Sequence, residues 1–329
     1  MTVALLEVEN LKTHFFGRRG VTKAVDGVTF SVEKSEIVGI VGESGSGKSV
    51  TSLSVLRLVD APGRIVDGTI RFEGRDLLAM SREEMRRLRG RRISMIFQEP
   101  GTSMNPVLKV GFQIAEAIRS HERVTDAEAR RRTLELMDLV GIPDAAHRID
   151  QYPHQFSGGM LQRLMIAMGL ALSPALLVAD EPVTALDVTI QAQILDLLRD
   201  LRDRTEAAVL LITHDMGVVA ETCDRVLVMY LGRVVEEAPV DKLFDAPLHP
   251  YTQGLLGSIP KIEEKVEWLE AIPGSVPSPH DVPSGCRFSN RCPKVMDVCH
   301  TAEPPLIEHG PGHRVACYLY ATEAEEDRG

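Results

Sequence analysis

Residues 42–49 read Gly42-Glu43-Ser44-Gly45-Ser46-Gly47-Lys48-Ser49, a full match to the pattern G-x-x-x-x-G-K-[ST]. The glycines let the backbone turn tightly, so that successive N–H groups converge on one polyphosphate. In such a loop the lysine reaches the β- and γ-phosphates, and the last hydroxyl binds Mg²⁺. Lys48 and Ser49 occupy these two positions, so the stretch predicts a phosphate-binding loop.

The neighbouring residues agree with this interpretation. Ile37 to Val41 is a short apolar run typical of a buried strand, and Val50 to Val59 has helical spacing. A strand, a glycine-rich turn and a helix in this order would place the phosphates at a helix N-terminus, where backbone N–H groups favour anions. The stretch therefore predicts an α/β fold.

Charge and hydropathy exclude two classes of protein. The chain of 329 residues has a net charge of -10, whereas nucleic-acid binding needs clustered Lys and Arg, so no nucleic acid is expected as a partner. The Arg-rich stretch 82–92 is a local exception, which a solvated helix opened by a Ser81/Glu84 capping box explains. Residues 1–10 predict a strand rather than a signal peptide. The most apolar stretch, 165–179, is too short to span a membrane and is interrupted by Pro174.

The chain is expected to contain two domains. Residues 5–16 and 22–32 alternate apolar and polar and predict an antiparallel sheet, with a further strand at 68–74. Apolar runs at 93–98, 176–180, 209–213 and 225–230 predict strands of a buried sheet. Helices are expected at 111–120 and at 125–140, the second with a capping box and a stop at Gly141. The prediction is a phosphate-loop core at 1–240 with a helical insertion at about 99–171, followed by a smaller extension at 241–329.

Several other short motifs could complete an ATPase, although each is weak alone. The strand at 176–180 ends in Asp180 and Glu181, which could hold hydrated Mg²⁺ and activate water respectively; many strands end in acidic residues. Ser157-Gly158-Gly159 could present a second anion-binding helix terminus or be a plain helix start. His214 could contact the γ-phosphate and Gln98 could bind Mg²⁺ or its water, or both could be ordinary surface residues.

Taken in order, these motifs resemble the ATP-binding subunit of ABC transporters over roughly residues 4–240. The matching residues are the phosphate loop, Phe97-Gln98, Ser157-Gly158-Gly159-Met160-Leu161-Gln162-Arg163, Asp180-Glu181, Ala185-Leu186-Asp187 and Thr213-His214-Asp215. Ser157, Gly158, Gly159 and Gln162 match the family's signature motif. Asp187 matches a loop at the dimer interface, and Phe15, or its neighbour Phe16, matches the aromatic residue that stacks on adenine.

The resemblance implies a head-to-tail dimer in which ATP lies between the phosphate loop of one chain and the signature helix of the other. Glu181 would be the general base. Lys48 and His214 would stabilise the γ-phosphate, and Ser49, Asp180 and Gln98 would organise Mg²⁺.

Longer strings are similar to the peptide/nickel importer branch, and in particular to its D-type dipeptide or oligopeptide ATPases. They include Ser103-Met104-Asn105-Pro106, Asp187-Val188-Thr189-Ile190-Gln191 and His249-Pro250-Tyr251-Thr252. This implies an ATP hydrolase at the cytoplasmic face of the membrane, attached through two permease subunits. A second, similar ATPase and an extracytoplasmic peptide-binding protein would complete the complex. Nickel or another solute is the alternative cargo, and a soluble ABC ATPase of translation or DNA repair is the alternative function.

Four of the five cysteines, Cys286, Cys292, Cys299 and Cys317, are in the last fifth of the chain, with spacings x5, x6 and x17. This is not the paired C-x-x-C of zinc ribbons. Four thiolates can bind a [4Fe–4S] cluster or Zn²⁺, and free thiols are the third possibility. Some members of the family resembled here carry a cluster on four C-terminal cysteines, so a cluster that fastens a proline-rich extension is expected. Cys223, in an apolar context, is expected to be a core residue.

Overall fold

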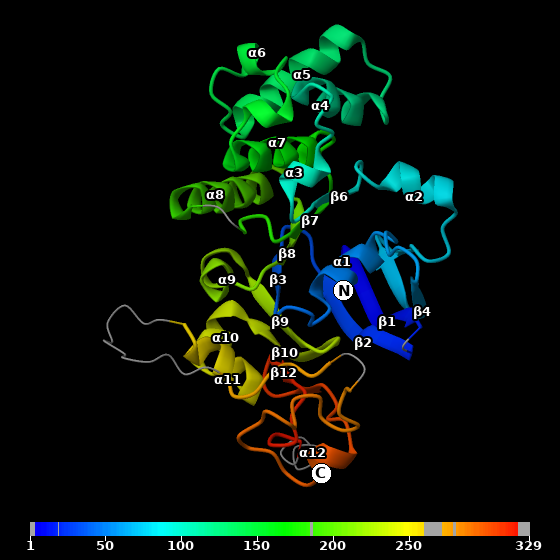
Figure 1. Cartoon of the computed structure of the whole chain (residues 1–329), viewed down its shortest axis with the longest axis vertical. Helices are drawn as coiled ribbons and strands as arrows, with labels where there is room; N and C mark the ends of the chain where they lie inside the picture. Colours follow the sequence, from blue (N-terminus) through cyan, green and yellow to red (C-terminus); the bar gives the residue numbers. More distant parts are fainter. Residues whose placement is uncertain (1–3, 19, 185–186, 260–271, 279–280, 322–329) are drawn as a thin grey trace. The chain divides into compact units, whose positions relative to one another are not determined.

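The computed structural model describes residues 4–18, 20–184, 187–259, 272–278 and 281–321, and Figure 1 shows its ribbon. The chain folds into two compact units. Unit 1 comprises Met1–Leu5, Val32–Glu36 and Ala79–Ile212, and unit 2 comprises Leu6–Ser31, Ile37–Leu78 and Thr213–Gly329. Ala185, Leu186 and the acidic residues after 321 lie outside the described part of the chain.

Unit 2 contains the predicted antiparallel sheet. Its four strands are ordered β2-β1-β4-β5, with bounds β1 (Leu6–Gly17), β2 (Gly20–Val32), β4 (Gly63–Phe72) and β5 (Arg75–Asp76). Strands β1 and β4 are antiparallel, with Leu6 opposite Phe72 and Phe15 opposite Gly63. Pairing along the whole of β1 makes β4 begin earlier than the predicted strand at 68–74. Leu6 and Val8 are buried in alternation, and after a register irregularity between Glu9 and Lys12 the buried positions resume at Leu11.

A second group of strands in unit 2 has the order β11-β12-β10-β9-β3. Their bounds are β3 (Ile37–Val41), β9 (Arg225–Tyr230), β10 (Arg233–Pro239), β11 (Ile307–Glu308) and β12 (Arg314–Val315). Strand β3 runs parallel to β9, and β12 pairs antiparallel with β10, so residues of the C-terminal region continue this sheet. The helices of the unit are α1 (Lys48–Val55), α9 (Met216–Thr222), α10 (Val240–Asp245), α11 (Pro250–Gly257) and α12 (Val298–Thr301).

Unit 1 contains three of the predicted buried strands, β6 (Ile93–Ile96), β7 (Leu176–Asp180) and β8 (Ala208–Ile212). They pair in parallel in this order, and every residue of β7 and β8 is buried. This explains why the three sequences are apolar runs without alternation. The helices are α2 (Arg82–Leu88), α3 (Pro100–Ser103), α4 (Val110–Arg119), α5 (Asp126–Leu139), α6 (Ala145–Arg148), η1 (Pro153–Gln155), α7 (Gly158–Leu170) and α8 (Val188–Thr205).

Local capping signals account for several helix ends. The Ser81/Glu84 capping box at the start of α2 is present in full. At α5 the Thr125 hydroxyl accepts the Glu128 N–H, but the Glu128 carboxylate pairs with Arg131 instead of turning back to the cap. The apolar stretch 165–179 is a helix end, a turn and a strand, because α7 stops at Leu170 and β7 starts at Leu176.

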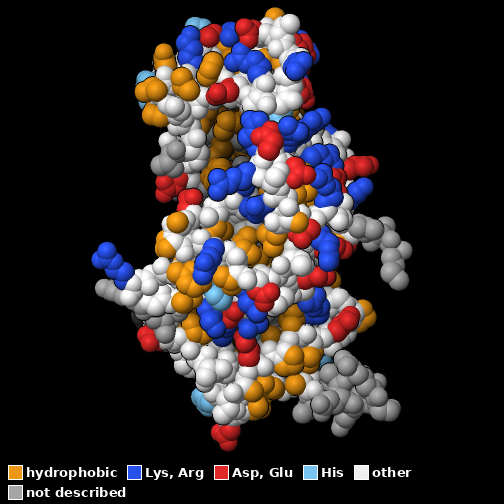
Figure 2. Space-filling view, turned by 90° about the vertical axis from the view of Figure 1, so that its right-hand side faces the viewer, with side chains coloured by type: hydrophobic (Ala, Val, Ile, Leu, Met, Phe, Trp, Pro, Cys, Tyr) orange, Lys and Arg blue, Asp and Glu red, His pale blue; other side chains and the backbone are white. Residues whose placement is uncertain are grey.

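The Arg-rich stretch at α2 is a solvated helix, as expected. Glu83 accepts hydrogen bonds from both Arg86 and Arg87 on its exposed face. On the face drawn in Figure 2, Lys and Arg side chains are interspersed with Asp and Glu. Mixed charges of this kind suit a hydrated surface.

Unit 2 also buries a histidine at the start of α11. His249 is 1% exposed, and its Nδ1 accepts the Tyr251 N–H at 3.0 Å. Burial lowers the pKa of His249 to about 4, although the neighbouring Glu236 carboxylate opposes this shift. The folded chain therefore keeps this imidazole neutral at a pH where the unfolded chain, with a His pKa near 6.5, takes up a proton.

Stability should therefore fall as the pH drops from the ordinary His value toward the lowered one. Between about pH 7 and pH 5 we expect His249 to contribute a loss of about 2 kcal/mol in the free energy of unfolding. A His249→Asn variant keeps a capping acceptor and should lack this component. Urea midpoints of both proteins at the two pH values check the prediction, and equal pH dependence in both would contradict it.

Candidate phosphate-binding and catalytic sites

The phosphate loop lies in unit 2 between a buried strand and a helix. Strand β3 is buried throughout, and α1 begins at Lys48. Two glycines are required by the space around the turn. Gly42 has φ 151°, and a Cβ there would lie 2.2 Å from the Met229 carbonyl oxygen. Gly47 has φ 101°, and its Cβ would lie 2.3 Å from the Ala24 carbonyl oxygen. Any side chain at these positions would collide with these carbonyl groups and displace the loop.

The polar groups of the loop fit a polyanion. Lys48 is 6% exposed, and its Nζ donates to the carbonyl oxygens of Gly42 and Glu43 at 2.7 and 3.1 Å. The ammonium is thus held inside the loop. Ser46 Oγ is buried and has no hydrogen-bond partner among the described residues. A buried hydroxyl without a partner is costly, and a bound phosphate oxygen would supply one.

Glu43 of the loop has two partners that sequence reasoning missed. Its backbone N–H donates to the Tyr251 hydroxyl at 2.8 Å, and its carboxylate accepts two hydrogen bonds from Arg291 at 2.7 and 3.1 Å. Tyr251 belongs to a string typical of the importer branch, which was a signal of its importance. Arg291 is next to Cys292, but it is 248 residues from Glu43 along the sequence, so no local pattern could indicate that the two pair.

The predicted catalytic carboxylates lie in unit 1 at the end of β7. Asp180 is 5% exposed. Glu181 follows with φ 47°, an uncommon conformation for this residue type, and its N–H donates to the Ile212 carbonyl oxygen at 2.8 Å. The Glu181 carboxylate accepts from Gln98 Nε2 and from the Thr184 hydroxyl, both at 2.9 Å. Unit 1 thus brings Gln98 to Glu181, and these donors fix the direction of the carboxylate.

The signature residues lie at the start of α7, from its N-cap to its second turn. Ser157 is its N-cap, and the hydroxyl accepts the Met160 N–H at 3.4 Å. Gly158 has open space where a Cβ would lie, whereas a Cβ on Gly159 would lie 3.0 Å from Ile190 of α8. Gln162 is 2% exposed, and its Nε2 has no partner among the described residues. This helix start therefore offers backbone N–H groups that no side chain covers at Gly158.

Asp187 also has a local role, because it is the N-cap of α8 and accepts the Ile190 N–H at 3.0 Å.

In unit 2, Phe15 packs against Gly63, and a Cβ added to Gly63 would lie 2.6 Å from the Phe15 ring. Phe16 is 38% exposed, and the Arg64 guanidinium lies 4.1 Å from its ring centroid. His214 is exposed at the start of the Thr213–Gly329 segment.

The predicted site residues are therefore divided between the two units. Unit 2 holds the phosphate loop, Phe15 and His214, and unit 1 holds Gln98, Asp180, Glu181, the signature residues and Asp187.

The four C-terminal cysteines gather in unit 2. Burial raises the pKa of Cys286 to about 11, and the charges of Cys299, Cys317 and Cys292 raise it further. Burial likewise raises the pKa of Cys292 and of Cys317, in each case with help from other members of the four. The thiols of Cys286, Cys292 and Cys317 each accept a backbone N–H two residues later, from Phe288, Lys294 and Leu319. Cys223 is buried elsewhere, as expected.

Metal-binding clusters and membrane-spanning helices are both absent from the described residues. Within those ranges, no group of three or more His, Cys, Asp or Glu side chains is arranged to hold a metal ion. In the same part of the chain, no helix combines the length and apolar character needed to cross a membrane.

Comparison with known proteins places these features in a family. The family described as "ABC transporter" matches residues 25–184, and the one described as "Oligopeptide/dipeptide transporter, C-terminal region" matches residues 235–299. The chain is 54% identical over 323 residues to the oligopeptide transport ATP-binding protein AppD of Bacillus subtilis (strain 168), covering 98% of both chains. It is 49% identical over 322 residues to the dipeptide transport ATP-binding protein DppD of Escherichia coli (strain K12), again covering 98% of both.

Solved structures agree on the fold. The dimeric ATP-binding cassette MJ0796, bound to ADP and Pi, matches with a TM-score of 0.66 and 25% identity over 71% of this chain and 98% of that one. The structure of cbiO1 from Clostridium perfringens matches with a TM-score of 0.63 and 25% identity over 74% and 92%. The α/β fold with its antiparallel sheet is thereby confirmed, as is the resemblance deduced from the motifs. The chain belongs to the family of ATP-binding proteins of ABC-type oligopeptide and dipeptide transporters.

Proposed function

We propose that this chain hydrolyses ATP to power the import of dipeptides or oligopeptides through partner membrane permeases. The observation that carries the proposal is the identity of about half of all residues, over nearly the full length, to proteins named for oligopeptide and dipeptide transport. The similarity includes the C-terminal region, which matches a family named for this cargo. Nickel or another solute is the alternative cargo.

The ATP site is proposed to form between two such chains. The phosphate loop of one chain and the start of α7 in the other each offer a helix N-terminus, and both favour a triphosphate. The unpartnered polar atoms Ser46 Oγ and Gln162 Nε2 support this role, since each is buried and in need of a partner. The similar cassette MJ0796 is itself dimeric in its solved structure. ATP would thus hold the two halves together, and hydrolysis would release them.

Each catalytic group has a proposed task. Lys48 and His214 stabilise charge on the γ-phosphate, and Phe15 or Phe16 stacks on adenine. Glu181 accepts a proton from the attacking water, while Gln98 and Thr184 hold its carboxylate in direction. Ser49, Asp180 and Gln98 are suited by their oxygen atoms to hold Mg²⁺, which when bound would neutralise phosphate charge.

The assigned base can be tested by Glu181→Gln. The amide keeps the size of the side chain and one acceptor oxygen but cannot accept a proton, so we expect ATP binding to persist and turnover to fall about 10²- to 10⁴-fold. Nucleotide affinity and phosphate release measure the two effects. Glu135→Gln, at an exposed residue of α5 in the same unit, is the matched control and should retain normal turnover. Normal hydrolysis in Glu181→Gln would refute the assignment.

The partners are proposed to be two integral permease subunits, a second similar ATP-binding subunit and an extracytoplasmic peptide-binding protein. The chain would then sit at the cytoplasmic face of the membrane, attached through the permeases. No nucleic acid is included, because the net charge is -10.

Affinity purification of the full chain from its native membranes tests this assembly. We expect integral membrane subunits and a second ATPase to co-purify, and peptide uptake to be lost when the chain is deleted. Recovery of ribosomes or DNA without membrane subunits would favour the alternative function, that of a soluble ABC ATPase of translation or DNA repair. Loss of nickel uptake instead of peptide uptake would change the cargo.

The four C-terminal cysteines are proposed to hold a [4Fe–4S] cluster, with Zn²⁺ as the alternative. Support comes from the electrostatic coupling of their thiols and from the backbone N–H groups directed at three of the sulfur atoms. Thiolates gathered in a partly buried place repel one another, and a positively charged iron–sulfur core would offset this repulsion. A cluster is larger than one ion, so it can be held by thiolates that are too far apart for a single metal. Its role would be to fasten this loop-rich region.

Metal analysis after anaerobic purification tests the cluster. We expect about four iron and four sulfide per chain, lost in Cys292→Ser and retained in Cys223→Ser, the control at a cysteine outside the group. Stoichiometric zinc without sulfide would support the alternative ligand. A wild-type chain that contains neither iron nor zinc would contradict both the cluster and the zinc site.

A further inference from the structure

Two buried arginines lie between Cys286 and Cys292. Arg287 and Arg291 are 7% and 6% exposed. A buried guanidinium is stable only where acceptors surround it, so the partners of these residues are informative. Both arginines direct their charge toward the elements that form and support the phosphate loop, all within unit 2.

Arg291 contacts the first turn of the loop. Its Nη1 and Nη2 donate to the two carboxylate oxygens of Glu43 at 2.7 and 3.1 Å, a paired geometry that sets direction as well as distance. Its Nε donates to the Pro273 carbonyl oxygen at 3.0 Å, and its Nη1 lies 3.3 Å from the Tyr230 hydroxyl. The arginine is thus itself held on two other sides.

Tyr251 holds the same loop residue through its backbone. Its hydroxyl accepts the Glu43 N–H at 2.8 Å. The ring packs against Tyr230 and Phe288, with centroids 4.7 and 5.4 Å away. Glu43 is therefore fixed at both its main chain and its side chain by residues that come after position 240.

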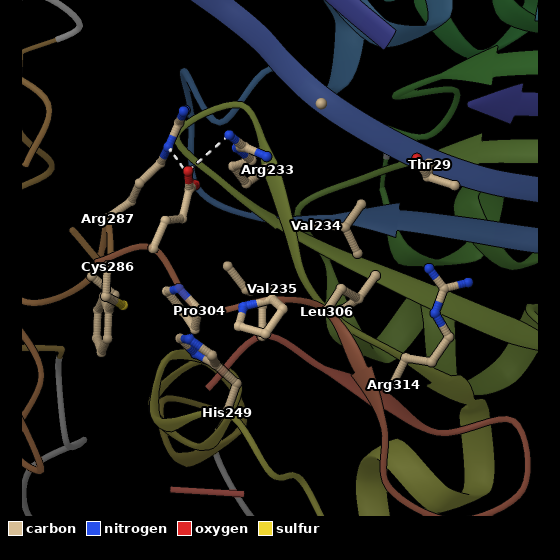
Figure 3. A pocket seen from close by; sticks show the side chains of 15 residues that line it. Thr29, Arg233, Val234, Val235, His249, Cys286, Arg287, Pro304, Leu306 and Arg314 are labelled. Carbon is tan, nitrogen blue, oxygen red and sulfur yellow. Dashed lines mark hydrogen bonds and ion pairs between the residues drawn. The ribbon is translucent and has the colours of Figure 1, made fainter. Parts of the chain in front are cut away.

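Arg287 supports the other side of the loop. It donates to the Leu231 carbonyl oxygen and to the Asp26 carboxylate. The next residue, Gly232, donates its N–H to the Ser46 carbonyl oxygen at 2.8 Å. Figure 3 shows Arg287 next to Cys286. Glu303 forms ion pairs with both Arg287, at 3.4 Å, and Arg233, at 2.8 Å. Arg287 therefore supports the turn between β9 and β10, and Gly232 of this turn is hydrogen-bonded to Ser46.

The charge at Glu43 gives these contacts a consequence for binding. A carboxylate in a loop that binds a triphosphate repels the bound anion. Arg291 both neutralises this carboxylate and holds it in one direction. We propose that segment 286–292 and Tyr251 of α11 together form a clamp on the phosphate loop, in which Arg291 and Tyr251 are positioning residues that hold Glu43 and so set the affinity for ATP. The inference rests on the proposed role of residues 42–49 in binding ATP.

A double-mutant cycle on the full chain tests the clamp. Arg291→Met removes the charge but keeps much of the volume, and it leaves Glu43 without its cation. We expect the dissociation constant and the KM for ATP to rise about tenfold, with kcat within about twofold. Glu43→Gln removes the repelling charge, so adding Arg291→Met to it should weaken binding far less than in the wild-type background.

Two further variants separate positioning from folding. Arg314→Met is the matched control, because Arg314 lies in the same region but pairs with Glu237 at 3.1 Å; its ATP affinity should equal that of the wild type. Tyr251→Phe removes only a hydroxyl, and it should raise the KM by a smaller factor even if Arg291→Met fails to fold.

The outcomes distinguish the two proposals. A wild-type chain that does not bind MgATP defeats the proposed function itself. A wild-type chain that binds ATP, with folded Arg291→Met and Tyr251→Phe variants of unchanged KM, overturns the clamp alone. A fall in kcat with constant KM and a lowered melting temperature also overturns it, because that pattern reports a smaller folded fraction. A raised KM that Glu43→Gln largely suppresses supports the clamp.

Discussion

The site in unit 2 depends on the fit of one tight backbone turn between carbonyl oxygens. Gly42 and Gly47 pass so close to the Met229 and Ala24 carbonyl groups that no side chain could be added. The turn carries Lys48 inward, where carbonyl oxygens of the same loop hold its ammonium group. Met229 belongs to strand β9 and Ala24 to strand β2. The loop therefore depends on the sheets around it as much as on its own sequence.

The C-terminal region is part of this support. Strand β12 continues the sheet through β10. Arg291 contacts Glu43 of the loop, and Arg287 contacts Leu231, whose neighbour Gly232 donates to Ser46 of the loop. The four cysteines lie in the same region, and three of their sulfur atoms already accept backbone N–H groups. A group bound by these thiols would therefore stabilise the segment that carries Arg287 and Arg291.

In unit 1 the residues proposed to act on the nucleotide also shape the backbone. Ser157 and Asp187 cap two consecutive helices of the described chain, and Ile190 of the second helix packs against Gly159 of the first. Glu181 is held by Gln98 and Thr184. A substitution at one of these positions would change local structure and ligand contact together, so binding and turnover have to be measured side by side.

Local sequence was sufficient for features that depend on neighbouring residues. The phosphate loop, the Ser81/Glu84 cap and the buried strands at 176–180 and 209–213 follow from backbone conformation, hydrogen bonding within one turn, and hydrophobic runs. The start of β4 was misjudged, because its length is set by pairing with β1 rather than by its own composition. The half-formed cap at Thr125 failed for a similar reason, since Arg131 competes for Glu128.

Contacts between distant segments were decided only by the tertiary structure. The order of motifs in the sequence by itself determined the family, because each motif has to follow a particular strand or precede a particular helix. Nothing in that order indicates that Arg291 pairs with Glu43, or that Tyr251 receives the N–H of the same residue. Such pairs form because a buried charge or hydroxyl must find a partner wherever the fold brings one near. That proximity is a property of the folded chain, since more than two hundred residues separate these partners along the sequence.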